Sequence, residues 1–323
     1  MDYIISLTNR CNLRCTYCYE RKLNTELGSM SDEITDYTIN FIKQKNNADI
    51  VYLFGGEPLL YKDKIKTFAC SIKSNYCVIT TNGMLLDEEF IKWCMDNNVM
   101  INLSHDCMDC SARGIKTEEL NEKLKILLEY QPNTLVQMVY EEKNLDRLAE
   151  NIMYFKNMGV KKISASMDAF LVPEDMDKFA DRMKEEWKKV ADIDGMFITQ
   201  IDDKYKVVKG HKNNKCEVCK RQMFINWDGK IYPCIQFQNN PEFYCGNVKD
   251  GLSTAPVIKK HPNYSLQSVR CNDCEIAEYC HNSCACRKMS STGGLDDISE
   301  AKCIEEQVHI LTVLDKMVEK KIQ

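Results

Sequence analysis

Several features that mark common protein classes are missing from this chain of 323 residues. No apolar run approaches the roughly twenty residues that a membrane span needs, and the N-terminus shows no basic segment followed by an apolar one, as an export signal would. There is no P-loop and no dinucleotide-binding glycine motif. Lysine plus arginine (43) nearly balances aspartate plus glutamate (48), so the basic excess typical of nucleic-acid-binding proteins is absent. We therefore expect a cytoplasmic protein that binds neither membranes nor nucleic acid.

Cysteine, by contrast, is abundant, with 18 residues in the chain. A content of 44% hydrophobic and 28% charged residues is ordinary for a folded globular protein and excludes the disordered and fibrous classes. Disulfides do not persist in a reducing cytosol, so this many thiols indicate metal or cluster ligands together with some buried thiols. Three lie between Cys11 and Cys18 and ten between Cys216 and Cys303, which suggests two chemical regions.

The first two hundred residues alternate between short apolar runs and amphipathic stretches. The expected strands are 3–7, 50–54, 77–81, 99–103, 134–139 and 162–166, and the expected helices are 32–45, 62–71, 87–96, 117–130, 145–157 and 174–190. Six strand–helix pairs predict an α/β fold, with a parallel sheet and helices outside it. Periodicity alone leaves open whether the sheet is an incomplete barrel or a doubly wound open sheet. In both cases ligands bind at the carboxyl ends of the strands.

Four segments that follow strands directly, 8–20, 55–58, 81–83 and 104–106, should therefore converge on one face. After about Ile201 the alternation ends. Residues 224–233 predict a hairpin with a tight Asp228-Gly229 turn. The remainder is short, loop-rich and dense in cysteine, which is typical of a region that needs metal to fold.

Three cysteines in the spacing C-x3-C-x2-C, Cys11, Cys15 and Cys18, lie on the loop after the first strand. Three thiolates can bind three irons of a 4Fe–4S cube and leave the fourth iron open for a ligand. A three-cysteine zinc site or unrelated thiols are the alternatives.

A second motif, Gly55-Gly56-Glu57-Pro58, follows the second strand. Two glycines let backbone approach a ligand closely, and a carboxylate can accept hydrogen bonds from an ammonium group. An ordinary turn between strand and helix is the alternative.

Together these motifs resemble the radical S-adenosylmethionine superfamily, and the resemblance implies a partial (β/α)6 barrel, similar to a TIM barrel, for residues 1–200. It implies that the three cysteines bind a 4Fe–4S cluster, whose open iron is chelated by S-adenosylmethionine. One electron then splits a carbon–sulfur bond and gives a 5′-deoxyadenosyl radical that abstracts hydrogen. The cofactor-binding residues implied by motif match are Gly55, Gly56 and Glu57 at the amino group, Tyr17 beside the adenine, Asn82 and Ser104 along the site, and Arg113 at the carboxylate. Relatives commonly have Ser-x-Asp-Gly where this chain has Ser104-His-Asp-Cys107, which leaves the role of Asp106 open.

The C-terminal cysteines resemble a SPASM domain, which carries two auxiliary 4Fe–4S clusters and would span residues 201–303, with a C-terminal helix at 304–323. By position, the ligands of the first auxiliary cluster would be Cys219, Cys234 and Cys284, with Cys216 as the fourth or with an open iron in its place. Those of the second would be Cys271, Cys274, Cys280 and Cys303. The cofactors expected in total are S-adenosylmethionine and three 4Fe–4S clusters. Cys245 and Cys286 are spare thiols, and Cys107 and Cys110 are expected to be buried.

Radical enzymes with two such auxiliary clusters mostly modify peptides, so the resemblance implies a maturase that installs a thioether or carbon–carbon crosslink in a ribosomally made peptide. One alternative is an anaerobic sulfatase-maturing enzyme, which forms formylglycine. Its acidic base would directly follow Cys234, where this chain has Ile235. Peptide epimerisation, with Cys245, Cys286 or Cys107 as hydrogen donor, is also open. An iron–sulfur electron carrier or redox sensor is the alternative from a different class.

The expected partners follow from this chemistry: a precursor peptide and an external one-electron reductant of the flavodoxin or ferredoxin type. Few residues precede Cys11 or follow Cys303, which leaves no room for a peptide-recognition domain. We therefore expect that either a separate protein recognises the peptide, or the barrel mouth and the SPASM surface bind it directly.

Overall fold

The structure is a computed structural model that describes residues 1–24, 26–45, 48–211, 221–253, 271, 273–280, 288–289, 292–295 and 298–322. They form two compact units. The first comprises Met1–Ser104, Ser111–Thr134 and the described part of Glu217–Pro262, and the second comprises His105–Cys110 with the described parts of Leu135–Cys216 and Asn263–Gln323. No helix within the described ranges is both long and apolar enough to cross a bilayer.

The sheet of the first unit has the order β11-β10-β9-β8-β1-β2-β3-β4. Its strands are β1 (Asp2–Thr8), β2 (Ala48–Gly55), β3 (Ser74–Thr81), β4 (Val99–Ser104), β8 (Gln222–Ile225), β9 (Lys230–Tyr232), β10 (Gly246–Asn247) and β11 (Gly251–Leu252). Strands β1 to β4 are parallel neighbours, and β8 also pairs with β1 in parallel. From β8 to β11 the pairing is antiparallel. The first four strands thus have the sequential order that successive strand–crossover–strand units produce.

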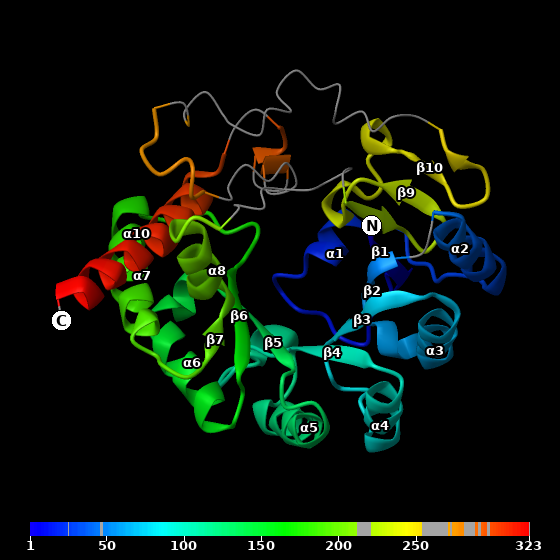
Figure 1. Ribbon diagram of the computed structural model, residues 1–323, viewed down its shortest axis with the longest axis horizontal. Helices are drawn as coiled ribbons and strands as arrows, with labels where there is room; N and C mark the ends of the chain where they lie inside the picture. Colours follow the sequence, from blue (N-terminus) through cyan, green and yellow to red (C-terminus); the bar gives the residue numbers. More distant parts are fainter. Residues whose placement is uncertain are drawn as a thin grey trace. The chain divides into compact units, whose positions relative to one another are not determined.

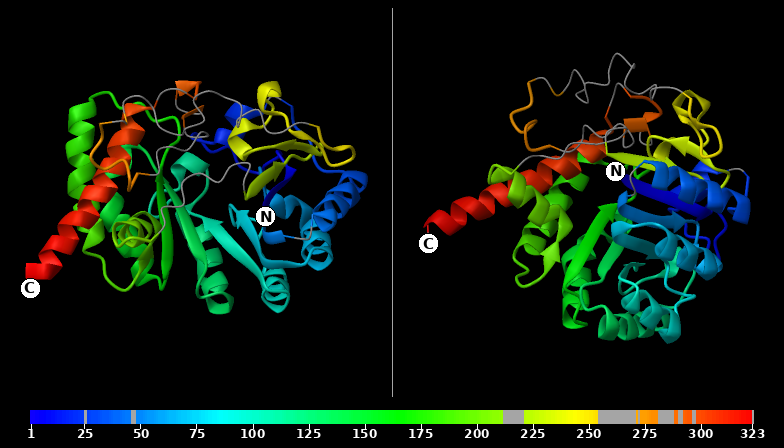
Figure 2. Two further views of the ribbon diagram at one scale, coloured as in Figure 1. Left: turned by 45° about the horizontal axis from the view of Figure 1, so that its top comes forward. Right: turned by 45° about the vertical axis from the view of Figure 1, so that its right-hand side comes forward.

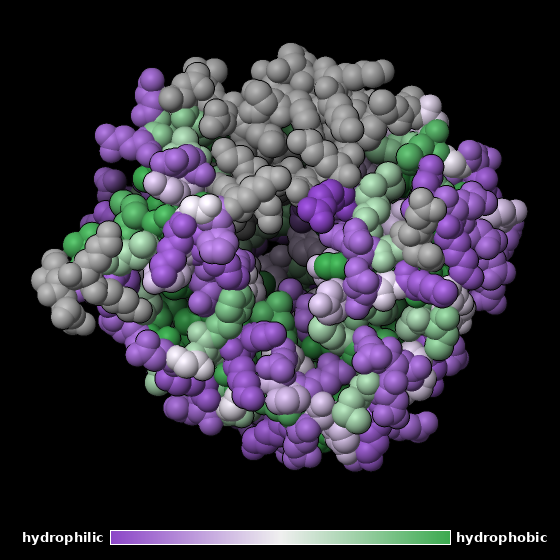
Figure 3. Space-filling model, viewed as in Figure 1, coloured by the Kyte–Doolittle hydropathy of each residue, from purple (hydrophilic) through white to green (hydrophobic). Residues whose placement is uncertain are grey.

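Helices cover the parallel part of this sheet (Figure 1). They are α1 (Tyr19–Leu23), α2 (Asp32–Gln44), α3 (Lys62–Ser71), α4 (Glu88–Asp96) and α5 (Thr117–Tyr130), with short 3-10 turns η1 (Pro58–Tyr61), η2 (Ser111–Arg113), η4 (Ile235–Phe237) and η5 (Pro241–Phe243). The side chains of Ser31 and Asp87 accept hydrogen bonds from the first turns of α2 and α4, which fixes where these helices begin. Where α4 and α5 face the viewer they present mostly hydrophilic side chains (Figure 3), while Phe90 and Leu124 are buried.

The second unit contains the parallel strands β5 (Leu135–Tyr140), β6 (Lys162–Met167) and β7 (Phe197–Ile198), in that order. Its helices are η3 (Glu142–Arg147), α6 (Leu148–Asn157), α7 (Met176–Ala191), α8 (Thr199–Val208) and α10 (Glu300–Ile322). Helix α10 packs against α7 and α8 and is the red helix in Figures 1 and 2. The core of the second unit includes four fully buried side chains, those of Val136, Ile163, Phe155 and Trp187.

The α/β class is confirmed, and each of the six expected strand–helix pairs is present. Helices α3 and α5 have the predicted bounds, and the stretch predicted as one helix at 145–157 is divided between η3 and α6. Sequence analysis missed α1, β7 and α8. Because α8 spans Thr199–Val208, the predicted boundary after residue 200 falls inside a helix. The bounds of the two functional domains remain a prediction.

The predicted hairpin is formed by β8 and β9, but its turn differs from the one expected. The backbone N–H of Gly229 donates to the carbonyl of Asn226 at 2.9 Å, so Trp227 and Asp228 occupy the central positions. Gly229 follows in a left-handed conformation with φ of 81°. This is a type I turn followed by a glycine bulge, which matches the twist of a three-residue hairpin loop. The expectation that Asp228-Gly229 is the central pair was therefore wrong.

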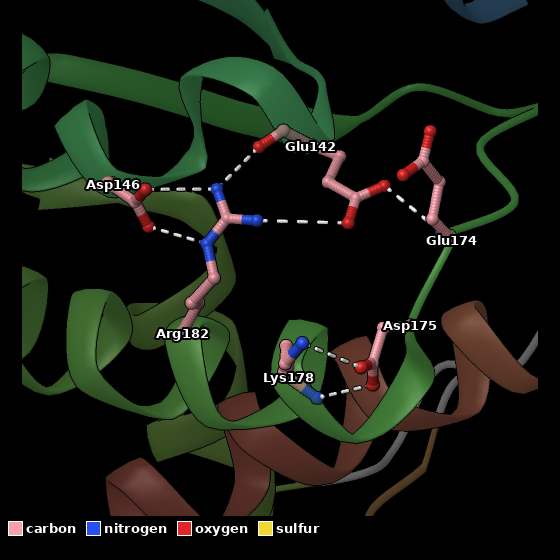
Figure 4. Close-up of polar contacts among 6 residues, drawn as sticks. All are labelled: Glu142, Asp146, Glu174, Asp175, Lys178 and Arg182. Atoms are coloured by element: carbon pink, nitrogen blue, oxygen red, sulfur yellow. Dashed lines mark hydrogen bonds and ion pairs between the residues drawn. The ribbon is translucent and has the colours of Figure 1, made fainter.

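Surface charges of the second unit meet in a network around Arg182 on α7 (Figure 4). Its guanidinium donates from Nε to Asp146 Oδ1 at 2.7 Å and from Nη2 to Asp146 Oδ2 at 3.0 Å, and Nη1 lies 3.7 Å from Glu142 Oε1. The Asp146 side chain is 64% exposed. Solvent therefore weakens this otherwise well-oriented pair.

We predict that Asp146→Asn lowers the free energy of unfolding by less than about 1 kcal/mol, because the pair is exposed. Phe155→Ala, in the buried face of α6, should lower it by roughly 3–5 kcal/mol through loss of packing. Urea unfolding of both variants measures the difference. A loss of several kcal/mol for Asp146→Asn would mean that the network is part of the stabilising core.

Candidate functional site

The loop that carries Cys11, Cys15 and Cys18 is bound to the carboxyl end of β2 through backbone hydrogen bonds. Gly56 N donates to Thr8 O at 2.7 Å, and Glu57 N donates to Arg10 O at 2.9 Å. A Cβ on Gly55 would lie 2.1 Å from Thr8 O, and one on Gly56 would lie 2.3 Å from Arg10 O. Gly55 also has a φ of 140°. The two glycines are therefore required for the close approach of the two backbones.

The Glu57 carboxylate lies at the centre of this arrangement and is fully buried. Its Oε1 accepts hydrogen bonds from Leu59 N at 2.9 Å and Thr81 Oγ1 at 2.7 Å, and its Oε2 accepts one from Asn82 N at 2.8 Å. Burial raises the pKa of Glu57, and these three hydrogen bonds partly offset the rise. The carboxylate thus joins the carboxyl ends of β2 and β3.

Asn82 extends the connection to the cysteine loop. Its Nδ2 donates to Asn12 Oδ1 at 2.8 Å and lies 3.7 Å from Cys11 Sγ, while its Oδ1 accepts from Met84 N at 3.0 Å. The segments 8–20, 55–58 and 81–83 therefore meet as the sequence analysis expected. Ser104, the last residue of β4, is half-buried.

The Cys11 sulfur accepts a hydrogen bond from Leu13 N at 3.3 Å. Desolvation raises the pKa of this thiol, and the negative charges of Glu57 and Cys18 raise it further. Cys18 is thus close enough to Cys11 to affect its ionisation. A cation bound to this sulfur would favour the thiolate, because a metal ligand must be deprotonated.

Arg113 lies against the other side of the cysteine loop. Thr16 N donates to Ala112 O at 2.9 Å, and the guanidinium of Arg113 lies 5.6 Å from the centre of the Tyr17 ring, in cation–π range. Arg113 is buried. Two residues predicted from the family motif, Tyr17 and Arg113, are therefore neighbours although they are far apart in sequence.

A second polar cluster surrounds Glu20, a residue that the sequence analysis did not single out. Gln238 Nε2 donates to Glu20 Oε1 at 2.9 Å, and Asn24 Nδ2 donates to Glu20 Oε2 at 3.1 Å. Asn239 Nδ2 in turn donates to Asn24 Oδ1 at 2.9 Å. Burial raises the pKa of Glu20 to about 7. This cluster ties the segment after Cys18 to the segment after Cys234.

Cys234 and Cys245 lie in the first unit. Cys234 is the N-cap residue of η4 and is half-buried. Desolvation raises the pKa of the Tyr19 phenol, and the charges of Glu20, Cys18 and Cys234 raise it further. Cys245 is buried, its thiol donates to Phe243 O at 3.4 Å, and burial raises its pKa to about 11. Cys216, Cys219, Cys284 and Cys286 lie outside the described residues.

The second unit holds Cys271, Cys274, Cys280 and Cys303, all half-buried. Desolvation raises the pKa of Cys303, with smaller contributions from Cys271 and Cys274, so these three thiols interact. Among the described residues no three His, Cys, Asp or Glu side chains are close enough to share one metal ion. A cluster does not require this, because each thiolate binds a different iron. The thiols around Cys11 and Cys303 are thus of the ligand type that iron–sulfur clusters use.

Cys107 and Cys110 are buried beside His105, as expected. The Cys107 thiol donates to Asn151 O at 3.1 Å, and burial raises its pKa to about 12. His105 Nδ1 accepts a hydrogen bond from Cys107 N at 3.0 Å. Asp106 Oδ1 accepts one from Val139 N at 3.1 Å, which gives this residue a structural role on β5.

Two protein-family models match this chain. A model of the radical S-adenosylmethionine (SAM) superfamily matches residues 5–140, and a model of the iron–sulfur cluster-binding SPASM domain matches residues 216–285. The protein is a radical S-adenosylmethionine enzyme with a C-terminal SPASM domain. Its two domains imply iron–sulfur clusters, and the first matched segment contains the site built around Glu57.

This radical SAM enzyme is similar to proteins with different activities. It is 23% identical to a cysteine-type anaerobic sulfatase-maturating enzyme of Clostridium novyi, over 86% of this chain and 85% of the relative. It is 24% identical to a tungsten-containing aldehyde ferredoxin oxidoreductase cofactor-modifying protein of Pyrococcus furiosus, over 87% and 89%. It is 27% identical to a GTP 3′,8-cyclase of Nautilia profundicola, over 91% and 97%.

Solved structures have the same fold. Native anSMEcpe with bound AdoMet and Cp18Cys peptide matches with a TM-score of 0.77 at 18% identity, over 100% of this chain and 99% of that chain. SuiB of Streptococcus suis bound to the precursor peptide SuiA matches with a TM-score of 0.66 at 15% identity, over 94% and 75%.

We predict that Glu57→Gln lowers the free energy of unfolding by roughly 1–3 kcal/mol, because the amide would direct its own N–H groups at buried donors. Glu33→Gln is the matched control, since Glu33 makes only an exposed ion pair with Lys249 and should change stability by less than about 0.5 kcal/mol. Urea unfolding measures both. Equal midpoints for the two variants would show that the buried carboxylate does not hold the strand ends together.

We predict that Glu20 makes stability depend on pH. The folded protein keeps this carboxyl protonated up to about pH 7, whereas its usual pKa is 4.5. Its contribution to the free energy of unfolding is therefore complete below pH 4.5. This contribution is lost as the pH rises toward 7 and above, by as much as ~3 kcal/mol at about 1.4 kcal/mol per pKa unit. Glu20→Gln cannot ionise and should reduce this loss. Urea midpoints at pH 5 and pH 8 test this, and an unchanged pH dependence in Glu20→Gln would refute it.

Proposed function

We propose that this enzyme modifies a ribosomally made precursor peptide and installs a thioether or a carbon–carbon crosslink. The observation that best supports the proposal is the convergence of the Cys11 loop, the Gly55-Gly56 backbone and Asn82 around Glu57. An electron carrier or redox sensor needs cysteine ligands but no such binding site beside them. Peptide modification is favoured because anSMEcpe and SuiB are solved with bound peptides.

Cys11, Cys15 and Cys18 would hold the catalytic 4Fe–4S cluster, and Gly55, Gly56, Glu57, Asn82, Ser104, Tyr17 and Arg113 would bind S-adenosylmethionine. When bound, the two together supply one-electron cleavage of a carbon–sulfur bond and a carbon radical that removes hydrogen from the substrate. Glu57 retains acceptor capacity for an ammonium group, because a carboxylate has about four acceptor positions and three are in use. The buried Arg113 offers a positive charge for a carboxylate.

Two auxiliary clusters would complete the enzyme, one on Cys219, Cys234, Cys284 and Cys216, and one on Cys271, Cys274, Cys280 and Cys303. They would accept the electron that remains when a substrate radical closes onto a heteroatom or carbon. A flavodoxin or ferredoxin type protein would supply the reducing electron, and a separate recognition protein could present the peptide.

Formylglycine formation is the second candidate, because the enzyme is similar over nearly its whole length to cysteine-type anaerobic sulfatase-maturating enzymes. Ile235 follows Cys234 and begins η4, so the position expected for the base carries no proton acceptor. Epimerisation is a further candidate: the thiols of Cys245 and Cys107 are buried and bonded to backbone carbonyls, and Cys286 lies outside the described residues.

We predict that anaerobically reconstituted enzyme binds about twelve iron atoms per chain and forms 5′-deoxyadenosine from S-adenosylmethionine under dithionite. Cys15→Ala should remove about four of these iron atoms and abolish 5′-deoxyadenosine formation. Cys70→Ala, at an exposed cysteine of α3, is the control and should leave both unchanged. Mass spectrometry of candidate peptides then detects the modification. Residual 5′-deoxyadenosine in Cys15→Ala would contradict the ligand assignment, and none in the wild type would favour the electron carrier.

A further inference from the structure

The segment that carries Cys271, Cys274 and Cys280 is wound by successive three-residue turns. Cys274 N donates to Cys271 O at 3.3 Å, Ala277 N to Cys274 O at 3.1 Å and Cys280 N to Ala277 O at 3.4 Å. Each of the three cysteines begins or ends one of these turns, so the spacing C-x2-C-x5-C follows the three-residue step of the chain. The turns are short and weak, and the segment needs support from the rest of the unit.

A buried lysine supplies that support. Lys204 on α8 donates from Nζ to the carbonyl oxygen of Tyr279 at 3.1 Å, and Tyr279 directly precedes Cys280. The same Nζ donates to Glu306 Oε2 at 2.5 Å, and Glu306 lies on α10 one turn after Cys303. The two side chains are only 4% and 5% exposed. Lys204 therefore joins the two segments that carry the proposed ligands of one cluster.

Helix α10 is held on the other side by a second buried pair. Glu305 Oε1 accepts hydrogen bonds from Tyr140 OH at 3.1 Å and Met167 N at 3.2 Å. Lys302 Nζ donates to Met167 O at 3.1 Å. Cys303 is thus flanked by side chains fixed to the carboxyl ends of β5 and β6. Lys204 and Glu306 link the helix to the segment 273–280.

Burying an ion pair is unfavourable for stability, because desolvation of both charges can exceed their attraction, and apolar residues often serve as well. A lysine that also binds a backbone carbonyl has a different use. It fixes the carbonyl that directly precedes Cys280 and places a positive charge beside that residue. Partners of this kind orient metal ligands, and their loss typically lowers metal affinity 10- to 100-fold.

We propose that Lys204, paired with Glu306, is a positioning residue for the second auxiliary cluster, the one assigned to Cys271, Cys274, Cys280 and Cys303. The inference rests on the proposed function, which assigns that cluster. Lys204 holds the Tyr279 carbonyl so that Cys280 is presented beside Cys303. Its positive charge also favours the reduced, more negative form of the cluster.

The test uses Lys204→Met in a background of Cys11→Ala, Cys15→Ala and Cys18→Ala, so that all measured iron belongs to auxiliary clusters. Lys206→Met is the control, because Lys206 lies two residues further along α8 on its exposed side, where it pairs with Asp203 and lies over the Phe197 ring. The double variant Lys204→Met/Glu306→Leu removes both charges together and restores packing. The readouts are the rate of iron loss to a chelator, the midpoint potential by electron paramagnetic resonance, and the unfolding temperature.

We expect Lys204→Met to lose iron from one cluster at least about tenfold faster than the background protein and to lower the midpoint potential of that cluster. Lys206→Met should change neither. In the double variant the unfolding temperature should recover while iron loss stays fast, since the carbonyl of Tyr279 still lacks its donor.

Iron loss at the background rate in the double variant would overturn the proposal, because it would make the pair a fold-stabilising contact only. A background protein that holds fewer than about eight iron atoms would refute the two auxiliary clusters of the proposed function, and this inference with them. If the background holds both clusters and Lys204→Met retains them normally, the proposed function stands and the role of Lys204 is refuted.

Discussion

The structure of the candidate site depends on one buried carboxylate. Glu57 accepts three hydrogen bonds, from the turn after β2 and from the end of β3, while its own N–H donates to the cysteine loop. A buried carboxylate is costly unless its acceptor positions are filled, so the surrounding donors must remain in place. The glycines before it allow the loop to approach, and Asn82 carries the connection to Cys11. The candidate site is thus preorganised by the same interactions that hold the strand ends together.

Much of the fold could be predicted because its signals are local. The apolar runs of β1 to β6 and the amphipathic stretches of α3 and α5 read directly from the sequence, and the residues that follow each strand share one face by the geometry of parallel sheets. The spacing of Cys11, Cys15 and Cys18 and the Gly55-Gly56-Glu57 motif predicted a candidate site, and the structure brings these segments together. Helix α8 was missed because it follows a strand of only two residues, which leaves no apolar run to mark a further strand–helix pair.

The buried polar residues could not be predicted, because their roles depend on partners distant in sequence. Glu20 has partners at 24 and 238, and Lys204 has partners at 279 and 306. In the sequence each looks like one more charged residue on a helix surface. The turn at Trp227 and Asp228 was missed for a related reason. Which residues are central in a hairpin loop depends on strand register, and the Asp-Gly pair alone does not determine it.

The two polar clusters suggest how one chain can position several clusters without a large core around each. Glu20 connects the segment after Cys18 to the segment after Cys234, and Lys204 connects the residue before Cys280 to the helix of Cys303. In each case the contact is to a neighbour of a proposed ligand and leaves the sulfur to the metal. Hydrogen bonds of this kind are directional, whereas apolar packing is not. Segments too short to bury much apolar surface can therefore present cysteines in a fixed arrangement.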